Sequence, residues 1–279
     1  MINPDTALVL EGGGMRGFYT IGVLDYFMDA GIEFPAVYGV SAGACHAMSY
    51  LSRQRGRAFR IGVDYLDNWR YCSVRSLILT GDLFGADFLY NRLPNELYPF
   101  DYAAFRENPA KMFAVCSNLV TGKAEYVPIT DGADDIVYVR ASSSLPLVSR
   151  TVKTPRGKLL DGGICDSIPV RRALSEYKRA VVVLTQPRGF KKEPSSSAKL
   201  VAARYARYPK FVEAAKNRHI DYNESLAVID EGVSSGGIFC LRPSAPIGFS
   251  RIEKDVAKLT ALYERGYADA KASGIDQFL

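Results

Sequence analysis

The chain of 279 residues has a mass of 30.7 kDa, and 48% of its residues are hydrophobic and 23% charged. This length and balance are those of an ordinary globular α/β protein with a sizeable core, and they exclude a chain dominated by disorder. The net charge of +5 could attract an anionic membrane surface or an anionic substrate, but a solvated surface with a slight excess of Lys and Arg explains it more simply, and we expect no nucleic-acid partner.

The first forty residues predict a strand, a glycine loop, a helix and a second strand. Residues 7–10 form a short apolar run typical of a buried parallel strand. Residues 11–17 are rich in glycine, and residues 18–30 place apolar side chains at a helical spacing that Gly31 ends. With the β-leaning pair 37–38, this order predicts a parallel sheet with a right-handed crossover.

The glycine loop has two interpretations. Gly12, Gly14 and Gly17 satisfy the G-x-G-x-x-G pattern, and Glu33 follows Gly12 by 21 residues, as in a dinucleotide-binding fingerprint. That fingerprint needs its acid at the end of the second strand, whereas Glu33 precedes this strand. We therefore favour an oxyanion hole, in which consecutive backbone N–H groups stabilise a developing negative charge. Arg16 either adds positive charge there or is simply solvated.

The second predicted strand runs into a candidate catalytic turn. Residues 39–43 read Gly-Val-Ser-Ala-Gly, and small residues and helix formers follow. This strand, sharp turn and helix order is that of a nucleophile elbow, so we predict that Ser41 is a nucleophile. The flanking glycines suit the turn because side chains there would collide. A second Gly-x-Ser-x-Gly occupies residues 232–236, but Ser234 follows a predicted helix end and lacks the preceding strand.

Helices and strands continue to alternate beyond the elbow. Residues 69–99 are apolar but irregular, and they predict either a lid or acyl-chain wall, or an ordinary packed connection. The other elements expected before residue 185 are a helix at 44–60, a hairpin at 111–118 and 125–129, a helix at 136–144, a hairpin at 151–155 and 157–160, a helix at 170–177 and a buried strand at 180–185.

The remainder of the chain is predicted to be mainly helical. Residues 186–197 carry Pro, Gly, Lys and Ser and predict a loop. The helical stretch 198–231 is basic at its start, which favours a solvated face, with an interfacial membrane helix as the alternative. A strand at 238–241 and a final helix at 251–272, opened by a capping box at 250–253, follow. The basic and tyrosine side chains at the start of the helical stretch 198–231 are Lys199, Arg204, Tyr205, Arg207, Tyr208 and Lys210.

We expect a single domain over residues 1–279, with its motifs in about residues 5–185 and a helical C-terminal extension over about residues 198–279. The five cysteines are scattered and only two histidines occur, so the sequence predicts neither a disulfide framework nor a metal site. A reducing, cytoplasmic location follows most simply from this cysteine usage. The first ten residues also lack the basic region and the apolar length of a signal peptide. No run of about 20 apolar residues occurs, so we expect any membrane contact to be peripheral.

A serine nucleophile needs a group that accepts its proton. His46 lies five residues into the helix after Ser41, about 7 Å along the axis, and is carried away from the hydroxyl. His219 lies among basic residues, where a surface role is expected. Asp161 ends a predicted strand and precedes two glycines that let the chain bend toward the crevice, although an ordinary Asp-Gly turn is the alternative. An aspartate base would need partial desolvation and an aligned hydrogen bond.

Three motifs occur in order along the chain, at residues 12–17, 39–43 and 161–163. Together they resemble the patatin-like phospholipase family, over roughly residues 7–185. The resemblance implies a three-layer α/β/α fold with a mostly parallel central sheet. It also implies that a Ser-Asp dyad hydrolyses acyl esters of lipids without a metal or cofactor, so the expected partner is a lipid or small ester substrate.

The resemblance also implies roles for particular residues. Ser41 would be the nucleophile and Asp161 the base. Residues 141–144 also look like the family, whereas Glu11 stands where the family typically has Asp, and residues 166–167 replace asparagines often found there. These departures bear on loop geometry and substrate preference. The implied oxyanion donors are Gly12, Gly13, Gly14, Met15 and Arg16, and the motif glycines are Gly17, Gly39, Gly43, Gly162 and Gly163.

Two functions of other classes stay open from the sequence. One is a nucleotide-binding module that uses the loop of residues 12–17, and bound dinucleotide after purification would indicate it. The other is a non-catalytic lipid-surface protein that works through residues 199–210, and liposome association without esterase activity would indicate it. Either kind of binding should survive Ser41→Ala. The sequence indicates no particular oligomeric state.

Overall fold

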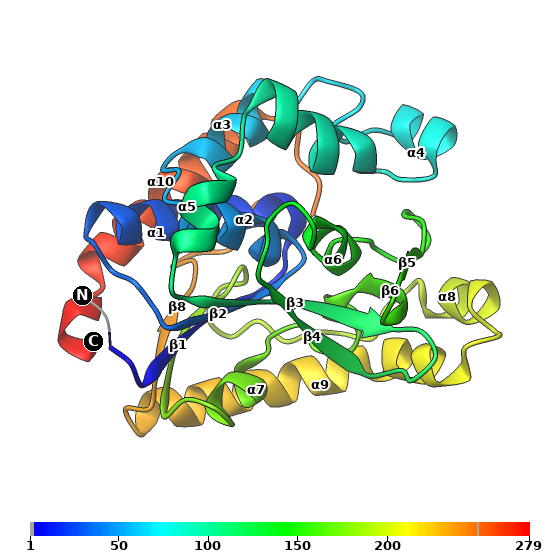
Figure 1. Cartoon of the computed structure of the whole chain (residues 1–279). Helices are drawn as coiled ribbons and strands as arrows, with labels where there is room; N and C mark the ends of the chain where they lie inside the picture. Colours follow the sequence, from blue (N-terminus) through cyan, green and yellow to red (C-terminus); the bar gives the residue numbers. More distant parts are fainter. Residues whose placement is uncertain (1–2, 250) are drawn as a thin grey trace.

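The computed structural model describes residues 3–249 and 251–279, which are organised around a mixed sheet of eight strands (Figure 1). The strand order is β5-β6-β3-β2-β1-β7-β8, and β4 pairs with β3 beside this path. The strands are β1 Thr6–Leu10, β2 Ala36–Val40, β3 Lys111–Asn118, β4 Ala124–Ile129, β5 Val152–Thr154, β6 Gly157–Asp161, β7 Arg179–Val183 and β8 Ile238–Leu241.

The centre of the sheet is parallel. Strand β1 pairs in parallel with β2 and β7, while β3 and β8 extend the parallel part on either side. The hairpins predicted from the sequence supply the antiparallel strands, because β4 and β6 pair with β3 and β5 pairs with β6. The expected α/β fold with a mostly parallel central sheet is confirmed.

Helices cover both faces of the sheet and make three layers (Figure 1). Successive side chains of a strand point to opposite faces. Leu8 and Leu10 of β1 accordingly join the core beneath α1, α2 and α10, whereas Ala7 and Val9 join the core against α7 and α9. The helices of the first face are α1 Phe18–Asp29, α2 Ala42–Leu51 and α10 Val256–Ala272, and those of the second are α7 Val170–Leu174 and α9 Pro209–Ser234.

The last long helix, α10, packs directly on the first, α1. A Cβ atom on Gly22 would lie 2.0 Å from the carbonyl oxygen of Tyr263, and one on Gly266 would lie 2.1 Å from the carbonyl oxygen of Tyr19. Both positions therefore need glycine for the two backbones to approach so closely. Tyr263 also donates its hydroxyl to Asp25 at 2.9 Å. The C-terminal part of the chain is thus fastened to its N-terminal part.

The predicted helices are confirmed in position, but several of the predicted start and end residues are wrong. The helix expected over residues 44–60 divides after α2, because Arg53 and Gly56 adopt positive φ angles of 56° and 73°. The helical stretch expected over residues 198–231 divides at a turn before Pro209, which begins α9. The remaining helices are α3 Arg57–Asp64, α4 Val74–Thr80, α5 Tyr102–Glu107, α6 Ile136–Ser142, α8 Ala198–Arg204 and α11 Ile275–Phe278.

The start of the last long helix also differs from the prediction. The expected capping box began at Ser250, which lies outside the described residues. Helix α10 begins at Val256, and the carboxylate of Asp255 caps it by accepting from the N–H groups of Ala257 and Lys258. Over residues 3–249 and 251–279, no helix combines the length and the apolar character needed to cross a membrane.

Candidate active site

Ser41 stands at a strained turn between β2 and α2. Its φ of 54° and ψ of −123° are unfavourable for a residue with a side chain. The turn has no room for larger neighbours, because a Cβ atom on Gly39 would lie 2.6 Å from the Cα of Ala44, and one on Gly43 would lie 2.6 Å from the carbonyl oxygen of Leu10. The geometry is that of the nucleophile elbow expected from the sequence.

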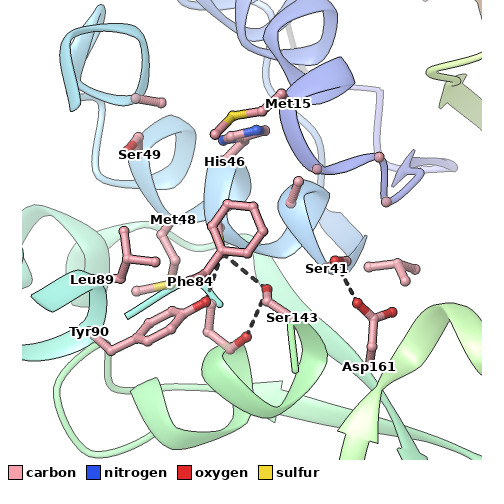
Figure 2. Close-up of a pocket in the computed structure, with 18 of the residues that line it drawn as sticks. Met15, Ser41, His46, Met48, Ser49, Phe84, Leu89, Tyr90, Ser143 and Asp161 are labelled. Atoms are coloured by element: carbon pink, nitrogen blue, oxygen red, sulfur yellow. Dashed lines mark hydrogen bonds between the residues drawn. The ribbon is translucent and has the colours of Figure 1, made fainter. Parts of the chain in front are cut away.

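The sheet register brings Asp161 to this turn. Strand β3 pairs with β2 through Val115 and Val40, and its next residue, Cys116, pairs with Asp161 at the end of β6. Because Ser41 follows Val40 directly, Ser41 and Asp161 lie beside neighbouring residues of β3. The hydroxyl of Ser41 donates a hydrogen bond of 2.7 Å to Oδ2 of Asp161 (Figure 2).

The carboxyl group of Asp161 is buried. Its side chain is 3% exposed, and burial raises the pKa of the carboxyl above its usual range. The hydrogen bond from Ser41, the charge of Arg218 and the N–H of Gly163, which donates to Oδ1 at 2.8 Å, oppose that rise in pKa. A Cβ atom on Gly162 would lie 2.0 Å from the carbonyl oxygen of Val115, so only glycine at this position lets the backbone pass so close to β3.

The glycine loop lies against Ser41. A Cβ atom on Gly12 would be 2.8 Å from the Cβ of Ser41. The amide groups of the loop do not all remain free, because Met15 donates its N–H to the carbonyl oxygen of Arg251 at 2.9 Å and Arg16 donates to that of Gly13 at 3.3 Å. Of the five expected oxyanion donors, the backbone N–H groups without a bond in the described chain are those of Gly12, Gly13 and Gly14.

The two histidines do not approach the serine hydroxyl. His46 packs beside the loop, where a Cβ atom on Gly17 would lie 2.6 Å from its Nε2. Burial lowers the pKa of His46 to about 4, so its ring is neutral at pH 7, and its Nε2 has no hydrogen-bond partner in the described chain. Nδ1 of His219 lies 3.1 Å from the carbonyl oxygen of Lys216 on α9. Asp161 is the carboxylate that meets Ser41.

A cavity of about 200 Å³ opens at Ser41, and its wall is mainly apolar (Figure 2). Residues 69–99, for which the sequence allowed a lid, an acyl-chain wall or an ordinary packed connection, supply part of this wall. They include Phe88–Leu97, a helical segment wound more widely than an α-helix. The apolar and aromatic side chains that line the cavity include Met15, Met48, Tyr71, Phe84, Leu89, Tyr90, Leu93, Ile136 and Val139.

Two serines position the site in ways that the sequence reasoning missed. Oγ of Ser142 accepts the backbone N–H of Ser41 at 2.9 Å and donates to the carbonyl oxygen of Val115 at 2.6 Å. The carbonyl oxygen of Ser144 accepts the N–H of Asp161 at 2.8 Å. The family-like stretch at residues 141–144 was the available signal, and its role is to hold both halves of the Ser41–Asp161 pair.

Three cations at the cavity were also missed. Lys192, Arg218 and Arg251 line it together with Arg16. They come from a loop, from α9 and from the segment before α10, so no local pattern connects them. The sequence suggested an interfacial membrane helix at residues 199–210 instead. Tyr205 of that stretch is buried, with 5% of its surface exposed.

Glu11, one of the departures from the family pattern, has a structural role. It is 2% exposed and accepts from the N–H and the hydroxyl of Thr185 and from the hydroxyl of Tyr222. It therefore joins the ends of β1 and β7 to α9. Of the other departures, Asp166 accepts the hydroxyl of Tyr126 at 2.7 Å, and Ser167 lines the cavity.

The competing motif residues lie elsewhere. Ser234 is exposed at the end of α9, and its hydroxyl donates to the carbonyl oxygen of Asp230. Glu33 pairs with Arg53 near the start of β2, at the opposite end of that strand from Ser41. Within residues 3–249 and 251–279, no three side chains of His, Cys, Asp or Glu gather closely enough to hold a metal ion.

Comparison with known proteins divides the chain into two matched parts. A family model described as patatin-like phospholipase matches residues 8–174. A second model, described as a domain of unknown function, DUF6363, matches residues 208–274. An alignment with the crystal structure of VipD from Legionella pneumophila covers 96% of this chain and 66% of the VipD chain. Its TM-score is 0.45 and its sequence identity is 13%.

Curated relatives match over parts of their own length. YjjU of Escherichia coli K12 is 32% identical over 181 residues, which cover 64% of this chain and 51% of YjjU. The protein named lysophospholipase NTE1 in Yarrowia lipolytica is 26% identical over 276 residues, which cover 93% of this chain and 18% of that protein. The chain thus spans about half the length of YjjU and less of NTE1. Because the patatin-like match covers more than half of its residues, the chain belongs to the patatin-like phospholipase family.

Proposed function

We propose that this chain is a serine acyl hydrolase that cleaves acyl esters of lipids through Ser41 and Asp161. The observation that carries the proposal is the 2.7 Å hydrogen bond from Ser41 to Asp161 at the foot of an apolar cavity. Membership of the patatin-like phospholipase family supports the substrate class, as does the similarity to a protein named lysophospholipase.

In the proposed reaction, Oγ of Ser41 attacks the ester carbonyl carbon while its proton passes to Oδ2 of Asp161. The tetrahedral intermediate collapses, the alcohol leaves with the proton from Asp161, and the acyl group stays on Ser41. Water then attacks the acyl-enzyme, again giving its proton to Asp161, and the released serine oxygen takes that proton back. Burial supports the role of Asp161, because a raised carboxyl pKa makes the carboxylate a stronger base.

The glycine loop would stabilise the negative carbonyl oxygen of the intermediate. Gly12, Gly13 and Gly14 line the cavity, and their N–H groups, which have no bond within the described residues, would donate to that oxygen. Arg16 lines it too, and its Nε has no partner in the described chain. We assign Met15 and the amide of Arg16 to holding the loop, because their N–H groups are already bonded.

The nucleotide-binding alternative has less support. Ser41 fills the space beside Gly12, and Thr185 fills that beside Gly13, where a Cβ atom would lie 2.7 Å from its Oγ1. Contact with a lipid surface has some support as a property in addition to hydrolysis, because Lys199, Arg204 and Lys210 are exposed. We propose peripheral contact with an anionic lipid surface there, which sedimentation with anionic vesicles would measure.

Turnover of a short p-nitrophenyl ester tests the hydrolase proposal. Ser41→Ala should abolish it, Asp161→Asn should lower it by about 10³-fold or more, and Ser234→Ala should leave it unchanged. Turnover that survives Ser41→Ala would exclude the proposed nucleophile. Because the five cysteines are free thiols, the assays belong in a reducing buffer, in keeping with the cytoplasmic location that we propose.

A further inference from the structure

Four cationic side chains meet at the cavity that contains Ser41 (Figure 2 shows the cavity around the serine). One of them, Arg16, belongs to the glycine loop. The other three, Lys192, Arg218 and Arg251, lie beyond the patatin-like match over residues 8–174. Arg218 and Arg251 fall within the second matched region. The C-terminal part of the chain therefore contributes the positive side of the cavity.

Each of these three residues is held in place next to the candidate catalytic residues. Arg218 donates to the carbonyl oxygen of Gly163 and to the hydroxyl of Ser167. The backbone of Lys192 is fixed to α9 by a pair of hydrogen bonds with Asn223, at 2.9 and 3.0 Å. The carbonyl oxygen of Arg251 accepts the N–H of the loop residue Met15. Hydrogen bonds thus fix the side chain of Arg218 and the backbones of Lys192 and Arg251.

The positive charge at this site is only partly compensated by nearby carboxylates. None of the four cations forms an ion pair with a described carboxylate. The carboxylates that act on them are Glu11, which already accepts three hydrogen bonds, and Asp161. Four positive charges thus face two negative ones.

Burial, and after it repulsion between neighbouring cations, lowers the pKa of Lys192 and of Arg218. Burial and Arg218 lower the pKa of Lys192 to about 7, and burial and Arg251 lower the pKa of Arg218 to about 10. Nε of Arg16 is buried and has no hydrogen-bond partner among residues 3–249 and 251–279. Partly buried cations that repel one another are stabilised when an anion enters between them.

We propose that Lys192, Arg218 and Arg251 form a subsite for the phosphate group of a lipid ester whose carbonyl lies at Ser41. This inference rests on the proposed hydrolase function and narrows its substrate to phosphate-bearing acyl esters. The apolar wall supplied by residues 71–93 takes the acyl chain, and the cations take the head group. A lipid phosphate fits better than a free anion, because the cations share one cavity with the apolar wall.

The test compares two soluble substrates that differ only by a phosphate, monooctanoylglycerol and octanoyl lysophosphatidic acid. Short chains used below the micelle concentration keep any charged lipid surface out of the assay. The readout is the ratio of kcat/KM for the phosphate-bearing ester to that for the neutral ester. We expect a ratio of about ten or more, and Lys192→Met and Arg251→Met should each lower it about tenfold, the effect of losing one charge-assisted hydrogen bond.

Two variants at neighbouring positions control the test. Lys191 is exposed and outside the cavity, so Lys191→Met should keep the wild-type ratio. Lys192→Arg keeps the charge and should retain most of the preference, which separates lost recognition from damaged folding. A wild-type ratio near one, or equal ratios in Lys191→Met and Lys192→Met, would overturn the proposal.

Inorganic phosphate distinguishes a lipid head-group site from a site for a free anion. It should inhibit hydrolysis of octanoyl lysophosphatidic acid competitively, and more weakly in Lys192→Met. If it inhibits while the wild-type ratio stays near one, the cations bind a free anion and the head-group proposal is wrong. If both esters are cleaved equally, the hydrolase function stands without the subsite, whereas cleavage of neither ester would refute the hydrolase function itself.

Discussion

Met15 donates its backbone N–H to the carbonyl oxygen of Arg251 at 2.9 Å, which ties the glycine loop to the segment before the last long helix. Contact is close there, since a Cβ atom on Gly14 would lie 2.6 Å from the same oxygen. The C-terminal part of the chain therefore shapes the loop that faces Ser41 and also brings cations to its cavity. A fragment that ends at the patatin-like match would lack both.

Gly12→Ala should sharply reduce hydrolysis. The added methyl would lie 2.8 Å from the Cβ of Ser41 and 2.9 Å from the carbonyl oxygen of Val40, so either the loop or the elbow must move. A displacement of about 1 Å at a reacting group costs on the order of 100-fold in rate. Gly237→Ala is the control, because its Cβ atom would meet only ordinary contacts at 3.9 Å. Esterase kcat measures the difference, and an unchanged kcat in Gly12→Ala would contradict the close fit.

Ser142→Ala should impair catalysis without contact between Ser142 and the substrate. The change removes the acceptor of the Ser41 N–H, so the elbow loses a hydrogen bond and its strained backbone is less well held. We expect kcat to fall by about tenfold and the free energy of unfolding by about 1 kcal/mol. Ser175→Ala, at an exposed serine, should change neither value. A wild-type kcat in Ser142→Ala would show that this bond does not position the nucleophile.

The pH profile should report the pKa of Asp161. Only the carboxylate accepts a proton, so kcat/KM should fall as pH drops through this pKa, which burial raises above the ordinary 3.8. Arg218 lowers the pKa of Asp161, so Arg218→Leu should move the acidic limb to higher pH. Rates on a neutral ester across the acidic range would measure it. A limb that moves to lower pH, or does not move, would mean that another group titrates.

Stability should respond to Asp161 in the opposite direction to activity. A carboxyl whose pKa is raised by folding stabilises the fold below its unfolded pKa, and this contribution is lost as pH rises through the folded pKa. At neutral pH the buried carboxylate is therefore unfavourable, and Asp161→Asn should raise Tm while it lowers turnover by about 10³-fold or more. Thermal unfolding at neutral and at acidic pH measures this, and the gain should shrink in acid. A lower Tm at neutral pH would mean that the carboxylate stabilises the fold.

The preference for a phosphate-bearing ester should weaken as pH rises through about 7. Burial, Arg218, Arg251 and Arg16 together lower the pKa of Lys192 to about 7, and the charge of Glu11 opposes them. Only protonated Lys192 attracts an anion, so the ratio of kcat/KM values should fall with its deprotonation. Octanoyl lysophosphatidylglycerol suits this test because its phosphodiester keeps one charge. Lys192→Arg should remove the fall, and a flat ratio in the wild type would contradict the assignment.

The sequence predicted the elements of this fold well because their signals are local. Apolar runs marked the buried strands, and the glycines around Ser41 marked the elbow. Helix division was missed, since Arg53 at a φ of 56° breaks the helix after α2 without a glycine or proline at that position. Tertiary packing allows such a conformation, and no local pattern announces it.

The candidate site was predictable only in part, because tertiary packing and not local sequence brings its residues together. Asp161 could be singled out because it is followed by glycines, but its contact with Ser41 depends on the register of β2 and β6 along β3. Lys192, Arg218 and Arg251 follow Ser41 by more than one hundred residues and lie in a loop, on α9 and in the segment before α10, so only the folded chain brings them together.

The most direct test of the central claim is covalent labelling with a fluorophosphonate, read by intact mass and peptide mapping. The wild-type protein should gain a single adduct on the peptide that contains Ser41. Ser234→Ala should label equally, Ser41→Ala should not label, and Asp161→Asn should label more slowly because its serine is less activated. An adduct that maps to another serine, or a wild-type protein that stays unlabelled while it hydrolyses ester, would contradict the assignment of Ser41 as the nucleophile.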